Sequence, residues 1–296
     1  FACPKTNKRW RFDINSHVLV EIDSKNNIID SSLHPGDSRK MEKTPSSISE
    51  ANDWFKKRYE NLSPIPTFPP EEDPAIAKWG KEYFMITPTL GPFVAVAYSF
   101  GFEPSLLLLA EYPKVFVHIA ELFLQRFEAY FEWAAKAGYD CGHMVESWCT
   151  ADLISPETYK NWVAPLHRQS AAMIKSKGLK AELYNPGWSM PILPYFKEQG
   201  WDILRFDDQC KGQEQDIAEI RRILGPDQCL YGNMNAYSLL KGDWDDITAR
   251  AQYQYEKAGK TGPFIMSNGS GVCDKTDPTI INKWINYSFT LFQDES

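Results

Sequence analysis

Polar residues that could do chemistry recur in this chain directly after short apolar segments. Three of them are carboxylates: Glu146, Asp207 and Asp208. A carboxylate in such a place can act as a general acid or bind a metal ion, but it can equally cap the next helix or pair with an arginine. The other polar residues suit hydrogen bonding to a polar ligand, and they are Thr87, Ser147, Asn185, Asn233, Asn268 and Ser270.

Aromatic residues follow the same apolar segments. Trp148, Tyr184 and Trp188 could form an aromatic wall beside the carboxylates. Aromatic faces stack on aryl groups and attract quaternary ammonium groups, so such a wall suits an aryl or quaternary-ammonium ligand, although it also suits plain packing of loops. No lysine occupies these positions, which argues against Schiff-base chemistry.

Two histidines lie close to Glu146 in the sequence. His143 falls inside a predicted strand, and alternation with Glu146 predicts that His143 faces away from the pocket and packs against a helix. His167 is expected about three turns into the following helix, roughly 16 Å from the strand ends. That distance makes His167 a poor candidate ligand.

Short strands alternate with longer helices from residue 80 onward, which is typical of parallel strands joined by crossover helices. The predicted strands are 83–87, 139–145, 179–184, 201–206, 229–232 and 264–267. A closed (β/α)₈ TIM barrel needs about eight strands, so we expect that its first strand lay upstream of Phe1. The alternative is an open doubly wound sheet, but no glycine-rich phosphate motif follows a predicted strand. In a barrel, the polar strand ends would share one mouth.

Residues 1–79 have an irregular pattern, and we interpret them as an excursion packed on a barrel domain of residues 80–296. Alternation predicts one or two strands within 18–29, with a turn at Asn26-Asn27. A short helix is predicted within 46–61, and a proline-rich segment follows it.

Composition excludes several functional classes. The net charge is −7 and the basic residues are scattered, which argues against a nucleic-acid surface. No apolar run approaches the ~20 residues that a membrane span needs. The six cysteines form no C-x-x-C pair, so we expect free thiols in a reducing cytoplasm.

Four segments together resemble the uroporphyrinogen decarboxylase superfamily, whose members fold as (β/α)₈ barrels. Their order and spacing carry the resemblance, which covers about residues 80–293. The segments are TPTLGPFVAVAYSFGFEPSLLLL, GYDCGHMVESWCTADLISPETYKNWVAPLHRQSAAMIKSKG, GNMNAYSLLKGDWDDI and FIMSNGSGVCDKTDPTIINKWI.

The superfamily has a decarboxylase branch, which needs no cofactor or metal, and a branch of corrinoid-dependent methyltransferases. Many of the methyltransferases hold zinc through a His-x-Cys motif and a later cysteine. The matching positions here are Tyr184, Pro186 and Ser270, which do not supply such a ligand set. The resemblance therefore predicts no zinc of the usual kind, and any metal would need carboxylates, with Glu146 and Asp207 first.

The decarboxylase signatures are also incomplete. Tyr98 and Ser147 match two substrate-contacting positions, although Tyr98 could instead be a buried helix residue. The branch's C-terminal histidine falls at Ser270, and its arginine-rich segment would lie upstream of Phe1 or is absent. Arg205 is the only cation near the predicted strand ends, whereas a tetracarboxylate substrate favours several.

The preferred hypothesis is a cytoplasmic corrinoid-dependent methyltransferase. It would move a methyl group between a small donor, such as an aryl methyl ether or methylamine, and a corrinoid carried by a partner protein. Glu146 or Asp207 would be catalytic, and a homodimer is a further expectation. The alternatives are a decarboxylase and a family member that binds without catalysis. The predicted substrate-binding residues are Tyr98, Ser147, Trp148, Tyr184, Asn185, Asp208, Asn233, Asn268 and Ser270.

Overall fold

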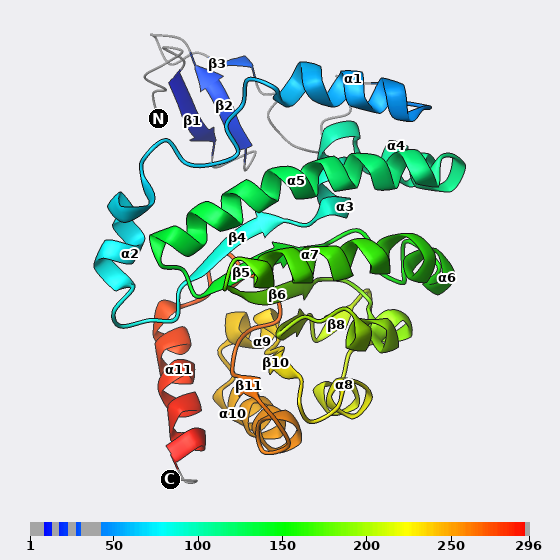
Figure 1. The fold of residues 1–296 in the computed structure, drawn as a ribbon. Coiled ribbons are helices and arrows are strands. Elements are labelled where there is room, and N and C mark those ends of the chain that lie inside the picture. Colours follow the sequence, from blue (N-terminus) through cyan, green and yellow to red (C-terminus); the bar gives the residue numbers. More distant parts are fainter. Residues whose placement is uncertain (1–8, 14–17, 23–27, 31–42, 294–296) are drawn as a thin grey trace.

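The central sheet of the protein has six parallel strands. The structure, a computed structural model, describes residues 9–13, 18–22, 28–30 and 43–293 (Figure 1). The order of the sheet is β11-β10-β7-β6-β5-β4. The strands are β4 (Ile86–Leu90), β5 (Cys141–Val145), β6 (Lys180–Asn185), β7 (Ile203–Phe206), β10 (Cys229–Tyr231) and β11 (Phe264–Ile265).

This sheet confirms the predicted α/β class and the six parallel strands. Within the described ranges, β11 and β4 stand at the two edges and do not pair with each other. Closure into an eight-stranded barrel therefore stays a prediction.

β4 starts and ends later than predicted. The sequence predicts a strand over 83–87 followed by a turn, but the strand continues through Pro88 to Leu90. β4 is an edge strand, and an edge strand tolerates a proline because one side of its backbone has no partner. Thr87 consequently lies inside the strand, where its hydroxyl contacts the hydroxyl of Tyr130.

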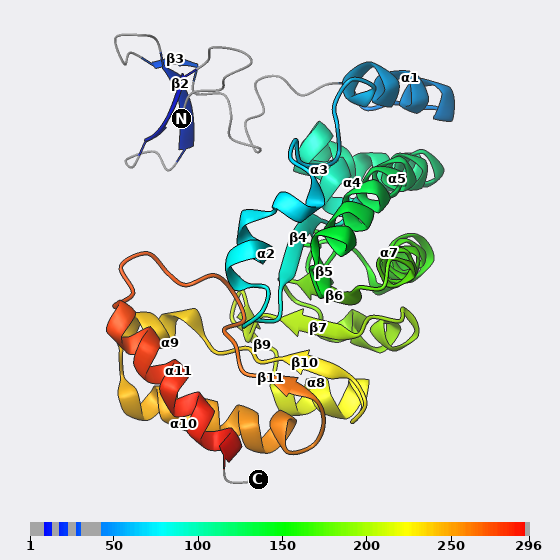
Figure 2. The ribbon, with the colours of Figure 1, turned by 60° about the vertical axis from the view of Figure 1, so that its left-hand side comes forward.

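Long helices follow most strands, as the alternation predicts. Figure 2 shows α5 (Pro113–Ala137) and α7 (Ala164–Ser176) on the same side of the sheet, and Ile76 of α2 (Pro74–Trp79) packs against the C-terminal part of α5. The helices after β4 are α3 (Pro92–Phe100), α4 (Phe102–Glu111), α5 (Pro113–Ala137), α6 (Pro156–Thr158), α7 (Ala164–Ser176), α8 (Ile217–Leu224), α9 (Ala236–Lys241), α10 (Trp244–Gln254) and α11 (Pro278–Gln293), with the 3₁₀ segment η4 (Met190–Glu198) and the π-helical segments η3 (Tyr159–Val163) and η5 (Tyr255–Gly259).

Local sequence signals explain several helix ends. α5 ends at Gly138, which adopts the left-handed conformation (φ 104°) that glycine tolerates. The Ser155 hydroxyl caps α6 by accepting from the Thr158 N–H. A break is predicted near Pro165, which has no N–H to donate; the structure instead places the π-helical segment η3 just before it and continues the helix as α7.

The N-terminal region contains an antiparallel sheet and one helix. β1 (Arg9–Asp13), β2 (Val18–Ile22) and β3 (Ile28–Asp30) pair in sequence order, which agrees with strands predicted within 18–29. The predicted turn at Asn26-Asn27 lies outside the described residues. α1 (Ile48–Tyr59) confirms the predicted helix and packs three of its aromatic rings against Phe123 of α5.

Within the described residues, no single helix is both long and apolar enough to cross a membrane. α3 and α4 reach that composition only when they are taken together, and they are bent by 114° at their junction.

Candidate active site on the inner face of the sheet

The two faces of the central sheet carry different kinds of side chain. A Cβ on Gly142 would lie within 3 Å of side-chain atoms of Phe131 in α5 and Ile174 in α7, so Gly142 faces these helices. Met144, two residues on, is fully buried in the main hydrophobic core. Alternation therefore turns His143, between them, toward the opposite face, which we call the inner face.

His143 and Glu182 contact each other on the inner face. They are register partners on β5 and β6, and His143 Nδ1 lies 3.0 Å from Glu182 Oε1. Glu182 is 1% exposed, and its Oε2 has no hydrogen-bond partner among the described residues. The prediction that His143 packs against a helix is wrong. Alternate residues of β5 face opposite sides of the sheet, so Glu146 faces the helices together with Gly142 and Met144, whereas His143 faces the inner side.

Tyr184 and Asp207 form a second polar pair on the inner face. The Tyr184 hydroxyl donates to Asp207 Oδ1 at 2.8 Å, and the Gly187 N–H donates to Asp207 Oδ2 at 3.1 Å. Burial raises the pKa of Asp207 above the ordinary aspartate value, although both hydrogen bonds act in the opposite direction. Burial and the nearby carboxylate also raise the pKa of Tyr184. Asp207 is thus a carboxyl group that holds its proton to higher pH than a free aspartate does.

Arg205 connects this pair to the loop after β11. Its guanidinium lies 4.5 Å from the ring centroid of Tyr184 and 5.7 Å from that of Tyr231. Arg205 Nε donates to the carbonyl of Gly269, and Nη2 donates to the carbonyl of Asn268. The loop is held further by the Asn268 side chain, which donates to the Ser270 carbonyl. The predicted residues Asn268 and Ser270 therefore lie in the loop that Arg205 ties to the inner face.

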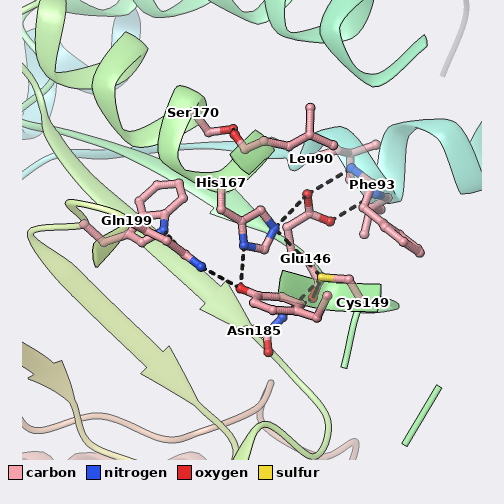
Figure 3. Close-up of polar contacts among 12 residues, drawn as sticks. Leu90, Phe93, Glu146, Cys149, His167, Ser170, Asn185 and Gln199 are labelled. Carbon is pink, nitrogen blue, oxygen red and sulfur yellow. Dashed lines mark hydrogen bonds and ion pairs between the residues drawn. The ribbon is translucent and has the colours of Figure 1, made fainter. Parts of the chain in front are cut away.

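Glu146 lies on the other side of the sheet, between β5 and the helices (Figure 3). It is fully buried. Its Oε1 accepts from the Phe93 N–H at 2.9 Å and its Oε2 from the Val94 N–H at 3.1 Å, at the start of α3. A Cβ on Gly91 would lie 2.2 Å from Glu146 Cδ, so only glycine allows this approach. The catalytic role predicted for Glu146 stays a prediction, and its position is that of a helix-capping carboxylate.

His167 and Cys149 join Glu146 in what we call the helix-side cluster, defined by these three residues. His167 Nε2 is 3.5 Å from Glu146 Oε1 and 3.9 Å from Cys149 Sγ. The prediction that His167 is remote from the strand ends is wrong. Residues 147–155 carry the chain beyond the end of β5 before α6 begins (Figure 1). The helical segment then runs back along the sheet, so His167, eleven residues after Pro156, lies beside Glu146.

Asn185 also points toward the helix-side cluster. Its Nδ2 donates to the Glu146 carbonyl at 2.8 Å, and its Oδ1 accepts from the Ser189 hydroxyl at 2.6 Å. Asn185 is fully buried. The expectation that all polar strand ends share one mouth is therefore wrong for Glu146 and Asn185, whose side chains face the helices. The side chains of Tyr184 and Asp207 lie on the inner face instead.

Two further predicted residues line a pocket beside α8 and α10. Asp208 and Asn233 border this pocket of ≈ 490 Å³ together with Asn235. Asn235 Nδ2 donates to Asp208 Oδ2, and Asn233 donates to the Gln215 carbonyl at 2.9 Å. Burial raises the pKa of Asp208. This pocket is separate from the Tyr184–Asp207 pair, because neither residue lines it.

The predicted aromatic residues at α3 and the loop after β5 do contact each other. Tyr98 stacks on Trp148 with ring centroids 5.2 Å apart, and Phe102 approaches Trp148 edge-on at 5.5 Å. Tyr98 is 43% exposed, so it is not the buried helix residue of the alternative interpretation. Ser147, next to Trp148, is half-buried.

The positions that the resemblance assigns to zinc hold Tyr184, Pro186 and Ser270. The Tyr184 hydroxyl is bonded to Asp207, and Asp207 and Glu146 lie on opposite sides of the sheet, so these carboxylates cannot share an ion. Among the described residues, the single group of three or more candidate ligands is the helix-side cluster. Sequence reasoning missed Cys149 and Glu182, and the signal that could have found Glu182 is its alternation with Tyr184 in β6.

The family model of uroporphyrinogen decarboxylase (URO-D) matches residues 75–288. The chain is 28% identical over 155 residues to the uroporphyrinogen decarboxylase of Gloeobacter violaceus, covering 52% of this chain and 42% of that protein. It is 25% identical over 194 residues to a methylated-thiol–coenzyme M methyltransferase of Methanosarcina mazei, covering 64% of this chain and 44% of that protein. The chain thus spans less than half the length of these relatives.

A solved structure of a methyltransferase from Methanosarcina mazei superposes with a TM-score of 0.64 and 18% sequence identity, covering 73% of this chain and 61% of the other. At that identity the likeness concerns the fold alone. The family match covers the entire central sheet and most of its helices, and the protein belongs to the uroporphyrinogen decarboxylase (URO-D) family.

Proposed function

We propose that this protein is a methyltransferase that moves a methyl group from a small methylated donor to a corrinoid carried by a partner protein. Support comes from a methyltransferase among its relatives. The observation that carries the proposal is the Tyr184–Asp207 pair, because it places a carboxyl of raised pKa on the inner face.

The chemistry that this pair suits is protonation of a leaving group. When the bond between the methyl carbon and an oxygen or nitrogen breaks, the electron pair of that bond stays on the heteroatom while the methyl group passes to the reduced cobalt. An ether oxygen then needs a proton, whereas a quaternary nitrogen leaves as a neutral amine without one. Asp207 supplies it as a general acid, and a positioned general acid typically contributes about 10²–10⁴-fold in rate.

Two features of the protein suit a methylated donor better than a polycarboxylate: the contacts of Arg205 beside the Tyr184–Asp207 pair, and an exposed aromatic contact elsewhere in the chain. Arg205 is stacked against Tyr184 and already donates to two carbonyl groups, which leaves it poorly placed to bind a substrate carboxylate. The exposed aromatic contact of Tyr98 with Trp148 offers a surface on which an aryl group or a quaternary ammonium could stack. We assign substrate orientation to Tyr184 and to this aromatic contact.

A carboxy-lyase is the second candidate, because uroporphyrinogen decarboxylases are also among the relatives. One experiment separates the two. The purified protein is incubated with chemically reduced cobalamin and a panel of methoxylated aromatics and methylamines, and the cobalt absorbance is followed. In parallel, the protein is given uroporphyrinogen, and CO₂ release is measured.

Methylcobalamin formation that depends on the protein and is lost in Asp207→Asn supports the proposal. Release of CO₂ from uroporphyrinogen without any cobalt alkylation would replace it with the decarboxylase interpretation.

A further inference from the structure

The helix-side cluster has the ligand types and the spacing of a zinc site. In a tetrahedral zinc site with bonds of about 2.0–2.3 Å, a nitrogen and an oxygen ligand lie about 3.4 Å apart, and a sulfur and a nitrogen about 3.6 Å apart. The observed separations are 3.5 Å from His167 Nε2 to Glu146 Oε1 and 3.9 Å from His167 Nε2 to Cys149 Sγ. All three ligand atoms lie within 4.8 Å of one another.

The surroundings of His167 hold its ring as a metal ligand requires. Its Nδ1 is 2.9 Å from the Tyr159 hydroxyl oxygen, and the same oxygen accepts from Gln199 Nε2 at 2.9 Å. The Trp201 indole N–H in turn donates to Gln199 Oε1. The Tyr159 hydroxyl can donate or accept, and zinc binding requires the tautomer in which His167 Nδ1–H donates to its oxygen. That tautomer leaves the Nε2 lone pair free and aimed at Glu146 and Cys149 (Figure 3), which is the usual arrangement around metal-binding histidines.

Charge favours a cation in the same place. Glu146 is fully buried, and His167 is the one basic side chain of the described residues within ion-pair distance of it. Asn185 Nδ2 lies 3.6 Å from Cys149 Sγ and can donate to a thiolate there. Buried charges in proteins are paired or coordinate metal ions, and this cluster offers one buried carboxylate and one thiol to a single imidazole.

We propose that Glu146 Oε1, Cys149 Sγ and His167 Nε2 bind one zinc ion in the layer between the sheet and the helices. One sulfur, one nitrogen and one oxygen ligand suit Zn²⁺ and disfavour Mg²⁺ or Ca²⁺, which take oxygen ligands. The site is distinct from the Tyr184–Asp207 pair, because its three residues are completely buried and lie on the opposite side of the sheet from that pair. It joins β5 to α7 and, through the Phe93 N–H, to α3.

Cobalt substitution tests the proposal on the intact protein. The protein is produced in medium supplemented with Zn²⁺ or with Co²⁺, and metal content is measured by elemental analysis. We expect one equivalent of metal per chain, and the cobalt form should show a thiolate-to-cobalt charge-transfer absorption. Cys149→Ser should lose that absorption. Cys141→Ser is the matched control, since Cys141 is equally buried in β5 and belongs to no ligand group in the described residues.

Tyr159→Phe keeps the protein testable if Cys149→Ser does not fold. It leaves all three ligands in place and removes only the hydroxyl beside His167 Nδ1. Loss of such a supporting hydrogen bond typically weakens metal affinity about 10–100-fold, which a competing chelator would measure. The proposal is overturned if the protein binds no zinc or cobalt, or if Cys149→Ser retains one equivalent with an unchanged spectrum. Neither result bears on methyl transfer, which is assayed separately.

Discussion

The hydroxyl of Tyr184 donates a 2.8 Å hydrogen bond to Asp207 across two neighbouring strands of the sheet. Tyr184 pairs in register with Arg205, two residues before Asp207, so the contact is a diagonal one along the inner face. The contact brings a phenol next to a half-buried carboxyl group. Neither residue, taken alone in the sequence, would be identified as a proton donor.

Asp207→Asn should lower turnover by about 10²–10⁴-fold, the usual loss when a general acid is removed. The KM for the methyl donor should change little, since the asparagine side chain keeps the size and one hydrogen-bonding oxygen of the native aspartate. Steady-state kinetics with reduced cobalamin measure both constants. Asp208→Asn is the control, because Asp208 faces the pocket beside α8 and α10. If Asp208→Asn abolishes turnover and Asp207→Asn does not, the role belongs to that pocket.

Activity should fall as pH rises through the raised pKa of Asp207. The general acid must be protonated, so the active form is fully present below this pKa and is lost above it. The Tyr184 hydrogen bond lowers the pKa of Asp207, and Tyr184→Phe removes that effect. The descending limb of the pH–rate profile should therefore move to higher pH in Tyr184→Phe. A limb that stays in place or moves to lower pH would show that another group controls it.

Folding stability should depend on pH through the same residue. The folded-state pKa of Asp207 is raised above its ordinary value of 3.8. The stabilisation that Asp207 provides is therefore fully present below pH 3.8 and is lost as pH rises through the pKa of Asp207 in the folded protein. Asp207→Asn does not ionise, so the stability difference between the native protein and Asp207→Asn should become less favourable to the native protein over this range. Urea denaturation at a series of pH values measures the difference; a flat difference would contradict the assignment.

His143→Ala should destabilise the protein by about 1–3 kcal/mol, because it leaves a buried oxygen of Glu182 without its hydrogen-bonding partner. Glu182 is 1% exposed and its other oxygen is unpaired within the described structure. The double variant His143→Ala/Glu182→Gln should lose less than the sum of the two single variants. Chemical denaturation of all four proteins gives the coupling energy. Strict additivity would mean that the 3.0 Å contact contributes nothing.

Gly91→Ala should destabilise the protein by about 1–3 kcal/mol, the usual effect of overpacking. The added Cβ would lie 2.2–2.3 Å from atoms of Glu146 and would push this carboxylate away from the start of α3. Gly271→Ala is the control, since a Cβ there meets nothing within 4 Å. Thermal unfolding compares the two variants. Equal stability would show that Glu146 can move without loss of its two backbone hydrogen bonds.

The sequence by itself determined the class of fold and the family. Short apolar strands that alternate with helices dictate a parallel sheet, because each helix must return the chain to the same end. Local signals such as the Ser155 cap and Gly138 depend on neighbouring residues alone, so they could be read directly. The order of the four family segments likewise needs no coordinates.

Only the tertiary structure decided which polar residues meet. Four polar residues lie at or just after strand ends: Glu146, Asn185, Tyr184 and Asp207. A shift of one residue turns a side chain to the opposite face of a sheet. The sequence does not show which of the two alternating sets of side chains faces the helices. The same alternation placed His143 beside Glu182. His167 reaches Glu146 because the loop of residues 147–155 sets where the helix begins, and the length of such an excursion depends on packing between distant segments.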